Sequence, residues 1–140
     1  MNVDFLIVSD FAEIANGKLY LQGGGWDQLI AAQPFPFARA VGLAVGFDVP
    51  WNETNQRFNV HVEIIHDDSQ RALASVDGTI EVGRPAGLLP GQPQLFMMAV
   101  NAILTLEAPG EYVVIISVEG EERKRRAFRV HASPTGRPTG

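Results

Sequence analysis

The stretch from Pro109 to Val130 constrains the fold more than any other part of the sequence, because its large apolar side chains recur at every second position. Side chains of an extended strand alternate between two faces. One face of this stretch carries Tyr112, Val114, Ile116 and Val118, and a polar reversal at Gly120-Glu121-Glu122 then leads to Phe128 and Val130. The stretch predicts a β-hairpin, and a hairpin needs further strands beneath its apolar face to be stable in water.

The same alternation recurs along the rest of the chain between turn-forming residues. Asn16-Gly17 is a preferred hairpin turn, although Asp10 and Glu13 have the spacing of a helix capping box and leave a helix open there. Gly23-Gly24-Gly25 predicts a bulge or loop. Further strands are expected over residues 3–9, 38–49, 58–64, 72–82 and 94–106.

Short strands at regular intervals without a convincing helical period predict an all-β fold. We expect an antiparallel two-sheet β-sandwich of about eight or nine strands, with a closed barrel as the alternative. Residues 1–131 are expected to form one domain, because a chain of 140 residues can bury a core of its own. Residues 132–140 contain little to bury and predict a flexible tail.

Composition narrows the class of protein and its surroundings. The chain has no cysteine and a net charge of −5, and its basic cluster around Arg125 faces glutamates across a tight turn. Without cysteine the chain cannot form disulfides. Its negative net charge and the local pairing of its basic cluster disfavour nucleic acid as a partner. The N-terminal residues lack the basic start of a signal peptide, and no segment is long and apolar enough for a membrane helix. We therefore expect a cytoplasmic protein.

The last third of the chain resembles the closing strands of immunoglobulin-like and fibronectin-type sandwiches over residues 95–131. The similarity lies in Leu106, the turn ending in Gly110-Glu111-Tyr112, and the strand containing Phe128-Arg129-Val130. The spacing up to Tyr112 is similar to a tyrosine corner, in which the tyrosine hydroxyl bonds to the backbone a few residues upstream.

Most of the chain also resembles a family of uncharacterised bacterial proteins. The resemblance rests on VDFLIVSDFAEIANGKLYLQGGGWD near the start, on the segment from Phe96 to Asn101, and on the later PGEY and GEE elements. It implies a bacterial sandwich without an assigned activity.

The strand over residues 38–49 has an unusual pair of faces. Its odd positions are large and apolar, whereas its even positions include Ala40, Gly42, Ala44 and Gly46. A solvated face normally carries polar side chains, and glycine in a strand often marks the close approach of another backbone or a ligand. This small-residue row predicts a contact surface.

Other apolar positions also lack a place in a single core. Val113 and Ile115 lie opposite the apolar face of their strand, residues 94–106 are apolar on both faces, and Leu88 and Leu89 lie in a long loop. We expect a non-catalytic module for contact with a protein partner, most simply by self-association into a homo-oligomer. In the alternative interpretation, the Pro-rich loops and the N-terminal segment cover these surfaces within the monomer.

A second function would use loop aromatics. If the loops containing Trp26, Asp27, Trp51 and Asn52 meet, these residues could bind a carbohydrate or another small ligand.

Candidate catalytic and metal-binding motifs are weak. On a strand, His61 and Glu63 share a face while His66 points to the other, so this segment is not a helical zinc motif. Asp67-Asp68 is ordinary turn chemistry, and no Gly-x-Ser-x-Gly motif is present. Because these motifs are weak, we expect no enzyme, cofactor or metal site. An enzyme would instead require a polar cleft that contains His61 or His66 beside a carboxylate.

Overall fold

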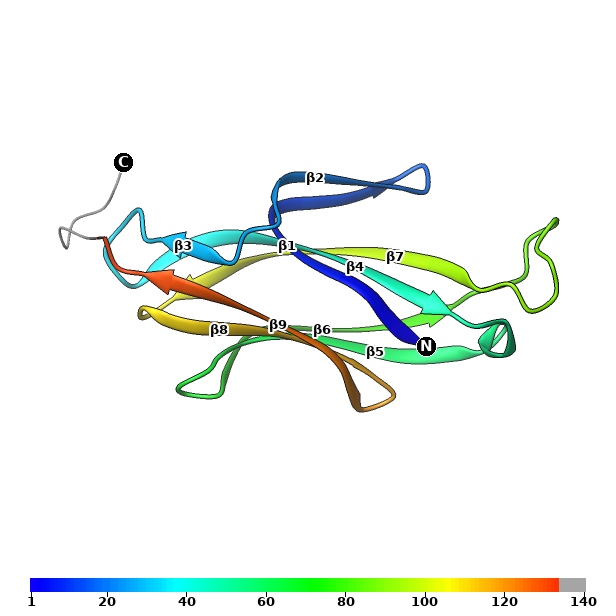
Figure 1. Ribbon diagram of the computed structural model, residues 1–140. Coiled ribbons are helices and arrows are strands. Elements are labelled where there is room, and N and C mark those ends of the chain that lie inside the picture. Colours follow the sequence, from blue (N-terminus) through cyan, green and yellow to red (C-terminus); the bar gives the residue numbers. More distant parts are fainter. Residues whose placement is uncertain (134–140) are drawn as a thin grey trace.

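The computed structural model describes residues 1–133, which form nine β-strands in two sheets (Figure 1). Sheet A has the strand order β2-β1-β4-β7, and sheet B has the order β3-β9-β8-β5-β6. A 3₁₀ turn, Trp51–Glu53, follows β4. The strands are β1 (Asn2–Ala15), β2 (Lys18–Gly24), β3 (Gln28–Ile30), β4 (Phe37–Val49), β5 (Arg57–His66), β6 (Arg71–Glu81), β7 (Gln94–Leu106), β8 (Gly110–Val118) and β9 (Glu121–His131).

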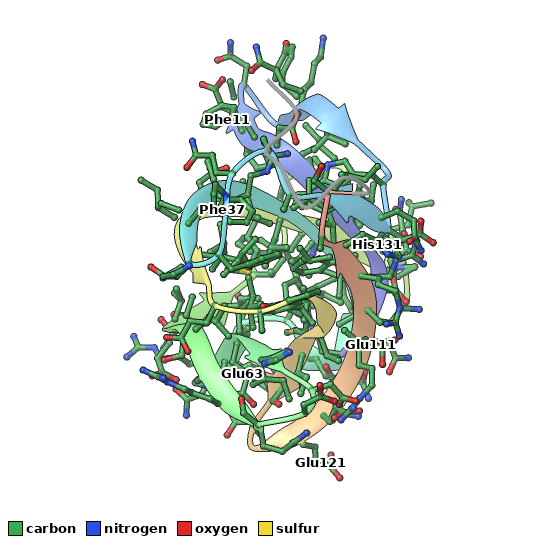
Figure 2. All side chains as sticks on the ribbon, turned by 90° about the vertical axis from the view of Figure 1, so that its left-hand side faces the viewer. Phe11, Phe37, Glu63, Glu111, Glu121 and His131 are labelled. Carbon is green, nitrogen blue, oxygen red and sulfur yellow. The ribbon has the colours of Figure 1, made fainter. Side chains whose placement is uncertain are left out.

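The two sheets face each other, and their apolar side chains fill the space between them (Figure 2). The odd positions of β4 and the even positions of β8 supply most of the fully buried side chains, as the alternation predicts. The expected all-β sandwich is confirmed, and the sheets do not close into one barrel.

The hairpin predicted from Pro109 to Val130 is formed by β8 and β9. Their register pairs Tyr112 with Phe128, and both side chains are buried in the core. The chain reverses at Glu119 and Gly120, with φ angles of 51° and 79°. The turn therefore begins one residue earlier than the sequence indicates.

The first hairpin also forms, at Asn16-Gly17, and the helix alternative at Asp10 does not. Both turn residues have positive φ, 51° and 72°, as a two-residue hairpin turn requires. Strand β1 is long and has two roles: up to Ser9 it pairs with β4, and from Ser9 onward it pairs with β2. The β1–β2 hairpin consequently stands above sheet A (Figure 1).

Strand β3 was not expected from the sequence. Its three residues pair in parallel with the end of β9, which makes it the exception in an otherwise antiparallel sandwich. A three-residue strand next to prolines and glycines gives no usable alternation, so the sequence pattern could not reveal it.

Two expectations about the termini and membranes remain. Most of the expected tail, from residue 134 onward, lies outside the described residues. Within residues 1–133, no helix is long and apolar enough to cross a membrane.

Candidate functional site

The outer face of sheet A is the surface that differs most from ordinary solvated protein surface. Residues directly opposite each other on neighbouring strands point to the same side of a sheet. Because the odd positions of β4 enter the core, its even positions and their partners on β1 and β7 point outward. This outer face comprises Phe5, Ile7, Ser9, Ala38, Ala40, Gly42, Ala44, Gly46, Leu95, Met97, Ala99, Asn101, Ile103 and Thr105.

None of these fourteen residues carries a charge, although Asp48, the remaining even position of β4, points the same way and is exposed. Asp48, opposite Leu95, marks one end of the face, and an ion pair between Asp10 and Arg39 lies near the other. Two large side chains on β7 are unusually accessible: Ile103 is 75% exposed and Leu95 is 54% exposed. The outer face of sheet A therefore presents apolar strand surface to its surroundings.

The outer face of sheet B has the opposite character. The register places His61, Glu63 and Asp77 on this face together with Arg125 and Arg129. Figure 2 shows Glu63 and Glu121 on the side of the molecule that faces away from sheet A. Sheet B thus presents charged side chains around a small buried apolar cluster, and the two outer faces of the sandwich are unlike each other.

The β1–β2 hairpin crosses the outer face of sheet A, and Asn101 holds it there. The Ala12 amide donates to Asn101 Oδ1 at 3.0 Å, and Asn101 Nδ2 donates to the Ala12 carbonyl at 2.8 Å. Beneath this contact lies Gly42, where an added Cβ would be 2.7 Å from the Ala12 nitrogen and 2.8 Å from Phe11 Cα. Only glycine leaves room for the backbone of β1.

The small-residue row is accordingly covered by the chain itself. Gly42, Ala44 and Gly46 are buried, and the Phe5 ring occupies the space that a Cβ on Gly46 would fill. The expectation that this row is an open contact surface is wrong for these three residues, because β1 supplies the close backbone that the glycines predict. Ala40 remains exposed.

The other predicted interface residues have mixed positions. Val113 and Ile115 are buried, packed with Ile65 and Ala127 in a small cluster on sheet B, so they are not available as a surface. Leu88 is half-buried and Leu89 is exposed, both in the loop before β7. Sequence reasoning singled out β7 as apolar on both faces but did not include Leu95, Met97 and Ile103 among the interface residues. The sequence signal that could have identified them is the absence of any charged residue over the 13 residues of β7.

The predicted ligand site at the loop aromatics does not assemble. Trp26 packs edge-on against Phe128 and lies near Arg39 at the start of β4, whereas Trp51 follows the end of β4. Ten residues of strand, roughly 33 Å, separate the two ends. Asp27 and Asn52 are exposed beside their respective tryptophans.

Trp51 also has a cation–π contact with an arginine of the same chain. The Arg84 guanidinium carbon lies 3.8 Å from the centre of the Trp51 ring, and Arg84 also donates to Thr54 Oγ1. One face of Trp51 is thus already occupied by an arginine.

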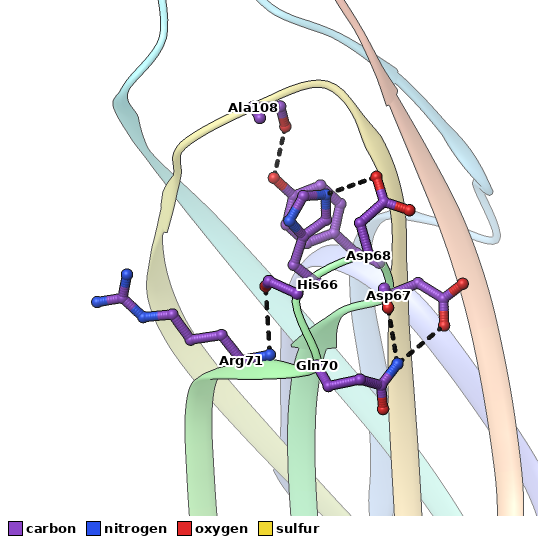
Figure 3. A network of polar contacts seen from close by, with 8 residues as sticks. His66, Asp67, Asp68, Gln70, Arg71 and Ala108 are labelled. Atoms are coloured by element: carbon purple, nitrogen blue, oxygen red, sulfur yellow. Dashed lines mark hydrogen bonds and ion pairs between the residues drawn. The ribbon is translucent and has the colours of Figure 1, made fainter.

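A cavity of about 250 Å³ lies at the end of the sandwich where β6 and β7 approach each other. His66 stacks on Tyr112 with ring centres 4.6 Å apart, and Tyr112 donates to the Ala108 carbonyl at 2.6 Å (Figure 3). Burial raises the pKa of Tyr112, so its hydroxyl stays protonated. Arg71 and Glu107 form an ion pair on the rim. The Tyr112 hydrogen bond is the local geometry expected of a tyrosine corner.

Both histidines singled out from the sequence lie beside carboxylates. His66 Nε2 is 4.0 Å from Asp68, and His61 Nδ1 is 2.7 Å from Asp77. The hydrogen bond that the His61 ring donates to Asp77 raises the pKa of His61. The other ring nitrogen of His61 faces Glu63 at 3.6 Å rather than a nucleophile. His61 therefore lies in a surface cluster of charged side chains together with Asp77 and Glu63.

Among residues 1–133, no group of three or more histidine, aspartate or glutamate side chains is placed to hold a metal ion.

These observations define an all-β sandwich with one charged outer face and one largely uncharged outer face. The chain belongs to a family of unknown function, DUF6941, whose model matches residues 4–131. The expectation of an uncharacterised family is thereby confirmed. The family model says nothing of the immunoglobulin-like resemblance, which stays a prediction.

Two solved structures are similar to parts of the fold. The alkylpurine DNA glycosylase AlkC of Pseudomonas fluorescens, bound to DNA containing an abasic site analogue, is 14% identical with a TM-score of 0.44. That match covers 76% of this chain and 28% of the glycosylase. The CARDB domain of a Pyrococcus furiosus protein, in complex with di-metal ions, is 12% identical with a TM-score of 0.35, covering 95% and 93% of the two chains. No curated protein matches the chain.

Proposed function

We propose that this protein is a non-catalytic module for protein–protein contact, and that it associates with itself through the outer face of sheet A. One observation carries the proposal: the outward positions of β4 and their partners on β1 and β7 carry a single charge, Asp48 at one end, whereas those of sheet B include five titratable side chains, His61, Glu63, Asp77, Arg125 and Arg129. A solvated sheet normally carries polar side chains on its outer face. A contiguous apolar face is instead typical of a binding surface.

The size of the face fits a modest interface. Three strands about 4.8 Å apart and about 34 Å long offer roughly 500 Å². Two such faces together reach about 1,000 Å², the lower end for a specific interface. The hairpin covers part of this area and adds its own exposed side chains, Phe11, Tyr20 and Leu21. Because this area is small, we expect the self-associated complex to be reversible rather than obligate.

The proposed setting is the cytoplasm, because a chain without cysteine suits a reducing compartment. Ligand binding by the loop aromatics finds no support, since Trp26 and Trp51 lie at opposite ends of β4.

The proposal predicts that a charge on the face weakens self-association. We expect Ile103→Glu to raise the dissociation constant of the complex at least about tenfold, because a charge buried at an interface loses its hydration without gaining a partner. Sedimentation equilibrium across the micromolar range measures this constant.

The matched control is Ile30→Glu. Ile30 is also an isoleucine on a strand and is 52% exposed, but it belongs to β3 of sheet B. Both variants add the same charge, so only position differs. A wild-type protein that stays monomeric throughout this range, or equal effects of the two substitutions, would contradict the proposal.

A further inference from the structure

Strand β7 is an edge strand without the usual protection against pairing. It ends sheet A, and β4 is its one sheet neighbour in the described part of the chain. Its 13 residues contain no charge, proline or glycine. Long uncharged edges expose a row of backbone donors and acceptors that another strand can satisfy, and monomeric proteins normally block them with charges, bulges or short strands.

The other edge strands of the sandwich carry such protection. β2 is short and ends in two glycines, and β3 has three residues. β6 includes Arg71, Asp77, Gly78 and Glu81. The contrast within one molecule singles out β7 as the edge that can accept a partner strand.

The positions of the two most exposed β7 side chains identify the partner. Leu95 and Ile103 point to the same outer face, and each is four positions from Ala99. A two-fold axis perpendicular to the sheet at Ala99 would therefore place Leu95 of each copy opposite Ile103 of the other. Directly opposed apolar pairs of this kind stabilise antiparallel strands. The pattern is self-complementary, as an isologous interface requires.

The inner side of β7 supports the same register. Met98 and Val100 are only partly buried at the edge of the core, and the axis at Ala99 would place Met98 of each copy opposite Val100 of the other. The pairing would thus cover apolar surface on both sides of the strand. The small Ala99 side chains would meet at the axis.

We infer that two copies of the chain pair edge to edge through antiparallel β7 strands, with the two-fold axis at Ala99, joining their A sheets into one continuous sheet. This inference rests on the proposed self-association and narrows it: the copies meet along the β7 edge of the outer face, at Leu95 and Ile103, rather than by stacking one face on the other. The outer faces of both copies then lie on the same side of the joined sheet.

Disulfide trapping tests this geometry, because the native chain has no cysteine. Opposed residues in an antiparallel pair have Cα atoms about 4.5–5.5 Å apart, within the range that a disulfide spans. Ala99→Cys should therefore form a covalent dimer under mild oxidation. Leu95→Cys alone should not, since its two copies would be about 27 Å apart in the joined sheet.

A mixture of Leu95→Cys and Ile103→Cys provides a second readout that does not depend on Ala99. We expect the mixed disulfide at least about tenfold in excess over either self-linked species. Circular dichroism confirms that each variant is folded. Equal cross-linking of Leu95→Cys and Ala99→Cys, or no preference for the mixed species, would overturn the edge pairing.

Sedimentation of the unmodified protein separates the two levels of the hypothesis. Association without the predicted disulfide pattern overturns the β7 geometry and leaves self-association in place. A strict monomer overturns both, and β7 would then be an edge for a strand of another protein.

Discussion

Asn101 shows how one polar side chain on an apolar strand can fix a larger element. Its amide makes the two hydrogen bonds to Ala12 that a neighbouring strand would otherwise make. In the sequence, Asn101 was named only as the end of the segment from Phe96 that carries the family resemblance. Its role depends on residues 89 positions apart, and such a contact has no local sequence signal.

Removing this amide should loosen the hairpin. We expect Asn101→Ala to lower the free energy of unfolding by about 1–3 kcal/mol, because two partly buried backbone groups lose their partners. Urea denaturation measures this loss, and faster hydrogen exchange of the Ala12 amide locates it. Asn101→Asp should retain protection of that amide, since an oxygen acceptor remains. Unchanged exchange in Asn101→Ala would contradict the assignment.

His61 gives the folded protein a pH dependence. The Asp77 hydrogen bond raises its pKa above the usual 6.5, so the folded state binds the proton more tightly than the unfolded state. The stabilising contribution is fully present below pH 6.5 and is lost as the pH rises through the raised value. The ring is exposed, so the effect on stability is small.

An NMR titration of His61 measures the pKa directly. We expect Asp77→Asn to move the pKa down toward its usual value. A wild-type pKa at or below 6.5, or a titration that Asp77→Asn does not change, would show that this pair does not form.

At the scale of elements, strand β4 illustrates what the sequence can and cannot predict. Alternation placed its odd positions in the core, and its glycines correctly indicated the close approach of a backbone. Which backbone approaches was not predictable, because Phe11 and Ala12 reach the outer side of Gly42 only after β1 leaves β4 and bends over the sheet. Only the tertiary structure shows that the backbone close to Gly42 belongs to the chain itself and not to a partner.

Two glycines in strands should respond differently to the same substitution. Gly42→Ala should destabilise the protein by about 1–3 kcal/mol, because the methyl group must displace the backbone of β1. Gly78→Ala should be neutral or stabilise by up to about 1 kcal/mol, because nothing lies within 4 Å of its added Cβ.

Urea midpoints of the two variants provide the comparison. Equal midpoints would indicate that β1 does not rest on Gly42. This result would also remove the reason for the burial of the small-residue row.

At the scale of the whole molecule, the sandwich and most of its strand boundaries followed from alternation and turn residues. Strand β7 was expected over residues 94–106 and is found there. The surface was harder to predict, because exposure depends on which neighbours lean over a residue. Val113 and Ile115 seemed to need an outside partner, yet both are buried within the chain, packed with Ile65 and Ala127 on neighbouring strands.

The unequal ends of sheet A limit how far assembly can proceed. Each copy has one long, unprotected edge at β7, while the opposite end is the short β2, raised above the sheet within its hairpin. Pairing about a two-fold axis uses the β7 edge of both molecules at once. Within residues 1–133, no second edge of the same kind is left to recruit a third molecule, so in the proposed pairing growth along the sheet stops at two copies.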